Sequence, residues 1–357
     1  MSRFTPRRGR FALGAAVALA VLAGPAAAGA MAGPGAVYTQ TNDPAGNVVQ
    51  AFDRDARGEL TPAGTFSTGG VGLAALGNRQ GAVDLSDDES TVYAVNGGSN
   101  SVSVFGAGRG GLALEDVAPS GGIAPNSLDE HHGRVYVLNS GGTPNVTAFS
   151  ARRDGTLEAI PGGRRELPGA LGAAQVSVAP GGDALVVSER LSNRLETLPL
   201  DAAGRPGAPV ITASSGAVPF GFAFGHRGDV VVSEAGASTV SSYRLGAGGL
   251  DVVSASLPVG FGAACWVAIS PNGKLAYTGN ASGTISGFAI GRDGSLDPLG
   301  ATPTPSLRDL AFSRNGRFLY AVSPTGRVTG YRVAGDGALE LLTSVPAAAG
   351  LTGIAAG

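Results

Sequence analysis

The chain has 357 residues, a formal net charge of −2 and only 15% charged residues. Its 59 Gly and 22 Pro exclude a helical bundle and favour many short strands joined by tight turns. The near-neutral charge argues against a nucleic-acid partner, and the single cysteine, Cys265, excludes an intramolecular disulfide.

Residues 1–32 are predicted to be a secretory signal peptide. Four arginines within the first ten residues precede an apolar run, 11–23, which is too short to cross a bilayer as a helix. Alanine-rich residues 26–32 then offer several cleavage sites. The Arg7–Arg8 pair is compatible with twin-arginine export, but an Arg-rich Sec signal is the favoured interpretation. We therefore expect a secreted protein with no membrane insertion once the signal is removed.

Residues 33–357 are predicted to form a single domain built from one repeat in seven copies. Each copy contains an apolar strand, a Pro-Asn-Gly-like turn, a second apolar strand, a small polar loop and an alternating strand; the clearest copy starts at Trp266. Equivalent positions in the second strands recur at intervals of 43 to 55 residues, at 38, 93, 136, 185, 230, 277 and 320. This is the period of a four-stranded propeller blade. The sequence therefore predicts an all-β fold, a seven-bladed β-propeller with four antiparallel strands in each blade.

The two ends of this domain are expected to close the ring together. Residues 350–357 resemble one more leading strand, which could pair with the strands at Tyr38 and Val48 and complete the first blade. Such pairing removes the open sheet edges at the two chain ends. Asp-Gly pairs at 154–155, 293–294 and 336–337 predict hairpin turns between outer strands.

The three histidines are predicted on the face opposite the usual ligand mouth, because they fall in turns between the first and second strands of their blades. These are His131 and His132 in one turn and His226 in another. A metal site or base pair at His131–His132 is an alternative, but two residues are too few ligands for a metal. We therefore predict solvated turn residues, no metal and no cofactor.

The loops on the mouth face carry the candidate site residues. Glu189 and Glu234 occupy the same position in neighbouring blades and are the candidate catalytic bases, although repeat symmetry alone could explain them. The candidate substrate-binding residues are Arg190, Arg194, Arg308, Gln175, Asn96, Asn139 and Trp266. Trp266 could also be a packing residue, and Cys265 is expected to be buried and inert because this face offers it no histidine.

Three stretches of the chain resemble the lactonase-like family of seven-bladed propellers, which includes bacterial 6-phosphogluconolactonase and the fungal carboxymuconate lactonizing enzyme. They are Val-Tyr-Thr-Gln-Thr-Asn-Asp at 37–43, Pro-Phe-Gly-Phe-Ala-Phe at 219–224 and Ala-Ala-Cys-Trp-Val-Ala-Ile-Ser-Pro-Asn-Gly at 263–273. The repeat is also similar to surface-layer propellers built on Tyr-Val-x-Asn units. The resemblance implies a propeller with a ligand mouth at one end of its channel.

Two motifs of active family members are altered here. The family's Gly-Pro-Arg-His is replaced by Gly-Ala-Ala-Gln at 172–175, and in the next blade Phe220 and Gly221 replace its Arg and His. The family's Asn-Glu-Leu keeps only its Glu, as Glu189 and Glu234. A mechanism that depends on that histidine is therefore not implied for this chain.

Two functions are consistent with these residues. The first is hydrolysis or cyclisation of a small anionic lactone by a secreted, monomeric protein. An arginine would bind its acid group, Glu189 or Glu234 would act as general base, and an Asn or Gln would donate to the oxyanion. The alternative is a non-catalytic extracellular propeller that binds a small ligand, a glycan or a partner protein at the same mouth.

Overall fold

The computed structural model describes residues 1–2, 35–74, 79–108 and 111–357. The predicted signal peptide, 1–32, therefore lies almost entirely outside the described residues. None of the described residues forms a helix long and apolar enough to span a membrane.

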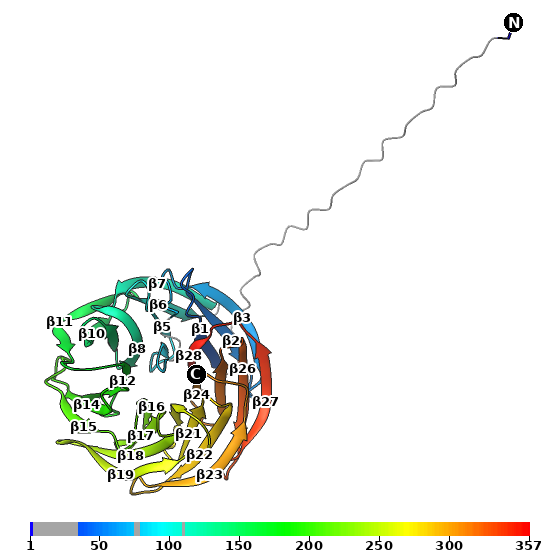
Figure 1. Cartoon of the computed structure of the whole chain (residues 1–357). Helices are drawn as coiled ribbons and strands as arrows, with labels where there is room; N and C mark the ends of the chain where they lie inside the picture. Colours follow the sequence, from blue (N-terminus) through cyan, green and yellow to red (C-terminus); the bar gives the residue numbers. More distant parts are fainter. Residues whose placement is uncertain (3–34, 75–78, 109–110) are drawn as a thin grey trace.

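Seven four-stranded antiparallel sheets form a ring around a central axis, as Figure 1 shows, so the predicted seven-bladed propeller is confirmed. Blade one has the order β28-β1-β2-β3, and blades two to seven follow in chain order as β4–β7, β8–β11, β12–β15, β16–β19, β20–β23 and β24–β27. In every blade the strand given first lies nearest the axis, because it contacts the first strands of the neighbouring blades.

The strands of blades one to four are β28 (Thr352–Ala356), β1 (Gly35–Gln40), β2 (Val48–Arg54), β3 (Leu60–Ser67); β4 (Val83–Leu85), β5 (Thr91–Asn96), β6 (Ser101–Gly108), β7 (Gly111–Pro119); β8 (Ile123–His131), β9 (Arg134–Gly141), β10 (Asn145–Ala151), β11 (Leu157–Glu166); and β12 (Ala173–Val178), β13 (Ala184–Glu189), β14 (Arg194–Pro199), β15 (Val210–Ala213). Those of blades five to seven are β16 (Pro219–Phe224), β17 (Asp229–Glu234), β18 (Thr239–Gly246), β19 (Gly249–Pro258); β20 (Ala264–Ile269), β21 (Leu275–Asn280), β22 (Thr284–Ile290), β23 (Leu296–Pro303); and β24 (Asp309–Phe312), β25 (Phe318–Ser323), β26 (Arg327–Val333), β27 (Leu339–Pro346).

The two chain ends close blade one as predicted. β28 pairs antiparallel with β1, placing Val37 opposite Ala356 and Thr39 opposite Ile354. Figure 1 shows the C-terminal strand lying beside β1 near the axis. Because the last strand completes the first blade, neither end of the repeat leaves an unpaired inner edge.

The hydrophobic core is divided among the seven blade-to-blade interfaces. Seven clusters of buried side chains are present among the described residues. Six of them are drawn from two adjacent blades, and the seventh joins blades six and seven and reaches Ala174 and Phe220 near the axis. Successive residues of a second strand contribute to different clusters: Val135 packs toward blade two, whereas Tyr136 packs toward blade four. Since both faces of such a strand are buried, its sequence is a nearly continuous apolar run. The repeat can be recognised in the sequence from these runs.

Candidate functional site

The first strands of several blades carry a bulge where they enter the mouth face. Their pairing registers shift between Pro125 and Ser127, between Ala173 and Gln175, between Pro219 and Phe222, and between Ala264 and Trp266. A bulge leaves one residue without a partner in the hydrogen-bond ladder and changes the direction in which its side chain points. The inserted positions include Asn126, Ala174, Phe220, Gly221 and Cys265, several of which belong to the altered family motifs.

A glutamine crosses the channel and occupies the space beside Gly221. Gln80 donates to the carbonyl of Val267 at 2.6 Å and accepts from the Val267 N–H at 3.0 Å, so it links blades two and six. A Cβ atom added at Gly221 would lie 2.0 Å from Gln80 Oε1 and 2.5 Å from the Cys265 carbonyl oxygen. The position at which the family carries its histidine therefore has no room for a side chain here.

The other predicted amides are also bound to protein groups. Gln175 donates to the Phe222 carbonyl at 2.9 Å and accepts from the Phe222 N–H at 2.8 Å. Asn96 donates to Ser103 Oγ at 2.8 Å, and Asn139 donates to the Ser120 carbonyl at 3.0 Å. The donors proposed for an oxyanion are thus already engaged within and between blades.

Trp266 lies inside the ring of blades rather than on the surface of the mouth. Its side chain is buried, and its indole N–H donates to the Arg79 carbonyl at 3.0 Å. It also packs edge-to-face on Phe220, with ring centroids 6.0 Å apart. This geometry is that of a packing residue, one of the two roles considered from the sequence.

Glu189 ends β13 and points toward the third strand of its own blade, away from the axis. It is fully buried, accepts from Arg194 Nε at 2.7 Å and also accepts from the Ser192 hydroxyl. Arg194 simultaneously contacts buried Glu196 at 2.7 Å. Burial, then the adjacent Glu189, raises the pKa of Glu196 to about 8. Arg194, predicted as a substrate ligand, is thus held between two carboxyl groups of blade four.

Glu234 has a similar orientation in blade five but different partners. It accepts hydrogen bonds from the Gly216 N–H at 2.7 Å, Ser241 Oγ at 2.6 Å and Thr239 Oγ1 at 2.5 Å. Gly216 belongs to the connection between blades four and five, whereas Thr239 and Ser241 lie on β18. The carboxylate therefore fastens an interblade connection to the third strand.

The two glutamates belong to a position that is polar in several blades. The second-strand residue that pairs with the start of the third strand directs its side chain to polar groups there. Asn96, Asn139 and Asn280 do so as well. Repeat symmetry is the alternative to catalysis that the sequence offers for Glu189 and Glu234. Their contacts fit that alternative, and no substrate contact is needed to explain them.

Two arginines lie at strand ends on the mouth side: Arg190 follows β13 in blade four, and Arg308 precedes β24 in blade seven. Arg190 donates to the Gly172 carbonyl at 3.3 Å, and its guanidinium lies 5.5 Å from the centre of the Phe220 ring. Burial lowers its pKa. Burial raises the pKa of the Cys265 thiol to about 11, while Arg308 and Arg190 act in the opposite direction. The charges of Arg190 in blade four and Arg308 in blade seven thus both act on the Cys265 thiol in blade six.

Asp309 is a buried channel carboxyl to which the sequence pattern assigned no role. It accepts from the Leu310 N–H at 2.9 Å and from the N–H groups of Ile354 and Gly81. It therefore joins blades seven, one and two near the axis. Burial raises its pKa well above the usual range, despite these three donors. No local motif distinguishes it, because its partners come from three distant parts of the chain.

The three histidines lie where first and second strands connect, on the face that the sequence predicts. His131 ends the long strand β8, His132 follows it in the turn, and His226 precedes β17. They are therefore remote from Cys265, whose thiol is buried and has a raised pKa. A histidine-activated thiol at the mouth is not formed by the described residues.

Comparison with known proteins supports the resemblance. A family model described as "Lactonase, 7-bladed beta-propeller" matches residues 45–161. No curated protein matches the sequence significantly.

Solved structures match over nearly the whole chain at low identity. A putative 6-phosphogluconolactonase from Bacteroides fragilis is 19% identical with a TM-score of 0.74, covering 90% of this chain and 97% of its own. The periplasmic gluconolactonase of Pseudomonas aeruginosa is 16% identical with a TM-score of 0.74, covering 90% and 98%. At such identities the likeness concerns the fold. Within residues 45–161 the chain is, in addition, similar to the lactonase family of seven-bladed β-propellers.

Proposed function

We propose that this protein binds a small anionic ligand, of the sugar-acid or lactone class, at the mouth of its channel. Arg190 and Arg308 supply the positive charge, and Phe220 supplies an apolar wall. The observation that carries the proposal is that the partly buried Arg190 side chain has no carboxylate partner in the part of the chain that the structure describes. Among the described residues it forms no ion pair, although burial already lowers its pKa. A partly buried guanidinium without a carboxylate favours an incoming anion, because the anion restores the charge balance lost on desolvation.

The ligand class is supported by the comparisons. The family model describes lactonases, and the two structural neighbours are named as a putative 6-phosphogluconolactonase and a gluconolactonase. Hydrolysis of an aldonolactone gives a carboxylate, and a phosphorylated lactone already carries a phosphate; an arginine binds either group through paired hydrogen bonds. We therefore favour an aldonate or its phosphorylated form over a neutral ligand.

Hydrolysis of the lactone is the second candidate, and the same comparisons favour it. The contacts of Glu189 and Glu234 speak against these residues as its general bases, since both carboxyl groups are buried against third-strand partners. A general base must come within hydrogen-bonding reach of the water that it activates. Gly221, which stands where the family has its histidine, cannot supply one either. We thus propose binding without turnover.

The binding experiment measures the affinity for 6-phosphogluconate and gluconate by calorimetry. Arg190→Gln and Arg308→Gln are each expected to weaken binding about tenfold or more, as loss of a charge-assisted hydrogen bond does. Arg332→Gln is the matched control, because Arg332 is exposed on β26 in blade seven. Unchanged affinity in both mouth variants would refute the mouth as the binding site.

Turnover is tested separately with 6-phosphogluconolactone and simple aldonolactones. We expect rates equal to the uncatalysed background for the wild-type protein and for Glu189→Gln and Glu234→Gln. Hydrolysis above background that one folded glutamate variant abolishes would instead establish a lactone hydrolase and identify its base. Export through residues 1–32 and a monomeric state remain proposals from the sequence.

A further inference from the structure

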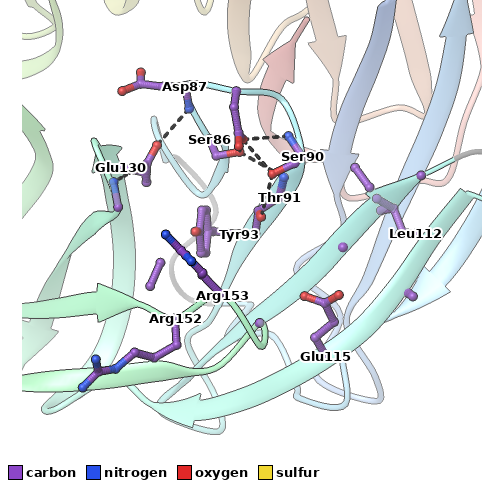
Figure 2. Close-up of a pocket in the computed structure, with 18 of the residues that line it drawn as sticks. Ser86, Asp87, Ser90, Thr91, Tyr93, Leu112, Glu115, Glu130, Arg152 and Arg153 are labelled. Atoms are coloured by element: carbon purple, nitrogen blue, oxygen red, sulfur yellow. Dashed lines mark hydrogen bonds between the residues drawn. The ribbon is translucent and has the colours of Figure 1, made fainter.

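The face opposite the mouth carries a groove between blades two and three, shown in Figure 2. Its volume is about 930 Å³, and it is lined by the strand-connecting turns of both blades. Asp87, in the turn between β4 and β5, and His132, in the turn between β8 and β9, both contribute to its wall. Two segments about 45 residues apart in sequence thus meet at one rim.

Three metal-ligating side chains converge at this rim. His132 Nδ1 lies 2.9 Å and His131 Nδ1 lies 4.0 Å from Asp87 Oδ2. One ligand atom from each of the three residues falls within 4.8 Å of the others. Of the residues that the structure describes, these alone form such a group of three His, Cys, Asp or Glu side chains. In the sequence, a metal at His131 and His132 is only the less favoured alternative because two residues are too few ligands, and the fold supplies the third, Asp87.

The backbone turns both imidazoles toward the same side. His131 is the last residue of β8, and in a continuing strand the next side chain would point to the opposite face. His132 instead adopts a left-handed conformation with φ of 51°. The ring centroids consequently lie only 4.1 Å apart. Adjacent histidines can therefore act together, which a regular strand would prevent.

A buried carboxylate fixes both turns from beneath. Glu130 accepts from the Asp87 N–H at 2.9 Å, a bond drawn in Figure 2, and from the Gly133 N–H at 2.5 Å. The Glu130 N–H in turn donates to Asp84 in the first strand of blade two, at 2.8 Å. One side chain thereby sets the position of Asp87 relative to the histidine turn. Such support is what holds ligands in place before an ion arrives.

We propose that Asp87, His131 and His132 form a binding site for a divalent transition-metal ion of the zinc class. Zinc takes imidazole nitrogen and carboxylate oxygen at about 2.0–2.2 Å, commonly with tetrahedral geometry. Tetrahedral ligand atoms at that radius are about 3.3 Å apart, which falls between the two distances to Asp87. A small rotation of the His131 side chain would bring its nitrogen within ligating distance of the ion. Water or a molecule in the groove would be the fourth ligand.

The donor set distinguishes among ions. Two imidazoles and one carboxylate suit zinc, copper, nickel or cobalt, whereas calcium and magnesium prefer sets of oxygens. The ion would replace the contact between Asp87 and His132 and bridge blades two and three. Both ligand-bearing turns are reachable, since the His132 side chain is 78% and the Asp87 side chain 51% exposed.

The test titrates the untagged full-length protein with Zn²⁺ in competition with a chromophoric chelator. We expect one ion per chain, with binding weakened about 100-fold or more by His131→Gln and by His132→Gln. Asp87→Asn should weaken it about tenfold or more. His226→Gln is the matched control, because His226 lies in the corresponding turn of blade five and belongs to no such cluster. Excess Ca²⁺ should not compete.

Two further measurements separate ligation from a change in structure. The metal-free variants should unfold at the same temperature as the wild type within a few degrees, and Zn²⁺ should raise the unfolding temperature only of the wild type and His226→Gln. Zinc affinity should fall on acidification, because protons compete with the ion for the imidazole nitrogens. No stoichiometric binding, or equal binding by His131→Gln and His226→Gln, would overturn the site.

Discussion

The two ends of the propeller differ in how their polar residues are used. At the mouth, where the sequence places most candidate groups, amides and carboxylates are bound to protein groups within and between blades. On the opposite face, where the sequence predicts solvated turns, Asp87, His131 and His132 converge at the rim of a groove. A polar residue in a loop therefore says little about chemistry until its partners are known.

The difference has a physical origin in the ring. Main-chain groups of the first strands lie close together around the axis, and those left out of the ladders need partners because buried polar groups are costly when unpaired. Gln80, Gln175 and Asn126 provide these partners. The turns on the opposite face meet water, so their side chains stay available. Three substitutions sharpen this contrast.

The largest effect is expected from restoring the family's histidine. Gly221→His would force a side chain into space held by Gln80 and the Cys265 carbonyl, so we expect a loss of more than about 3 kcal/mol of unfolding free energy, or no folded protein. Gly221→Ala should cost about 2 kcal/mol, and only part should return when Gln80→Ala is added, because the carbonyl remains. Urea denaturation measures these differences.

The control for this prediction is Gly248→Ala, since an added Cβ there meets no atom within 4 Å. Its effect should stay within about 0.5 kcal/mol. If Gly221→His folds with wild-type stability and gains lactone hydrolysis, the packing argument at the mouth fails.

An intermediate effect is expected at Glu234. Glu234→Ala leaves the hydroxyls of Thr239 and Ser241 and the Gly216 N–H without their acceptor, which should cost about 2–3 kcal/mol. Glu340→Ala, at an exposed position of β27, should change the unfolding free energy by less than about 0.5 kcal/mol. Equal small effects in both variants would mean that the carboxylate is not a structural fastener.

The smallest effect is a pH dependence that originates at Glu196. Burial raises its folded pKa to about 8 from an ordinary value of 4.5. The unfolded state therefore releases its proton first, and stability should fall as the pH rises from about 4.5 to about 8. Glu196→Gln imitates the protonated form, so it should be neutral at pH 4 and stabilising by on the order of 1–2 kcal/mol at pH 8.5.

Thermal unfolding at both pH values checks this prediction, with Glu340→Gln as the control for a lost surface charge. A stabilisation that is equal at pH 4 and pH 8.5 would show that Glu196 does not titrate in this window.

The blade repeat could be read from the sequence because it depends on local patterns. Second strands such as that around Tyr136 are buried on both faces and appear as apolar runs at blade spacing. The closing role of residues 350–357 followed from the count of strands. These inferences required only the hydrophobic period and the need to pair sheet edges.

The candidate site was less predictable because its residues are related by space rather than by sequence. The loop position of Glu189 and Glu234 was clear, but the direction of each side chain depends on Arg194, Thr239 and Ser241 on the third strands. Asp309 gained its partners from blades one and two. In the same way, no sequence spacing links Asp87 to the histidines of the next blade.

By itself, the sequence determined the number of blades, the strand order and the closure of the ring, since burial on both faces of each blade imposes the same apolar period seven times. Only the tertiary structure decided which polar groups are bound by protein and which remain available. The closed ring brings together atoms that lie 45 to almost 190 residues apart, such as Asp87 with His132 in the next blade and Gln80 with Val267 across the channel. Their contacts depend on the angle and distance between packed sheets, which no local pattern encodes.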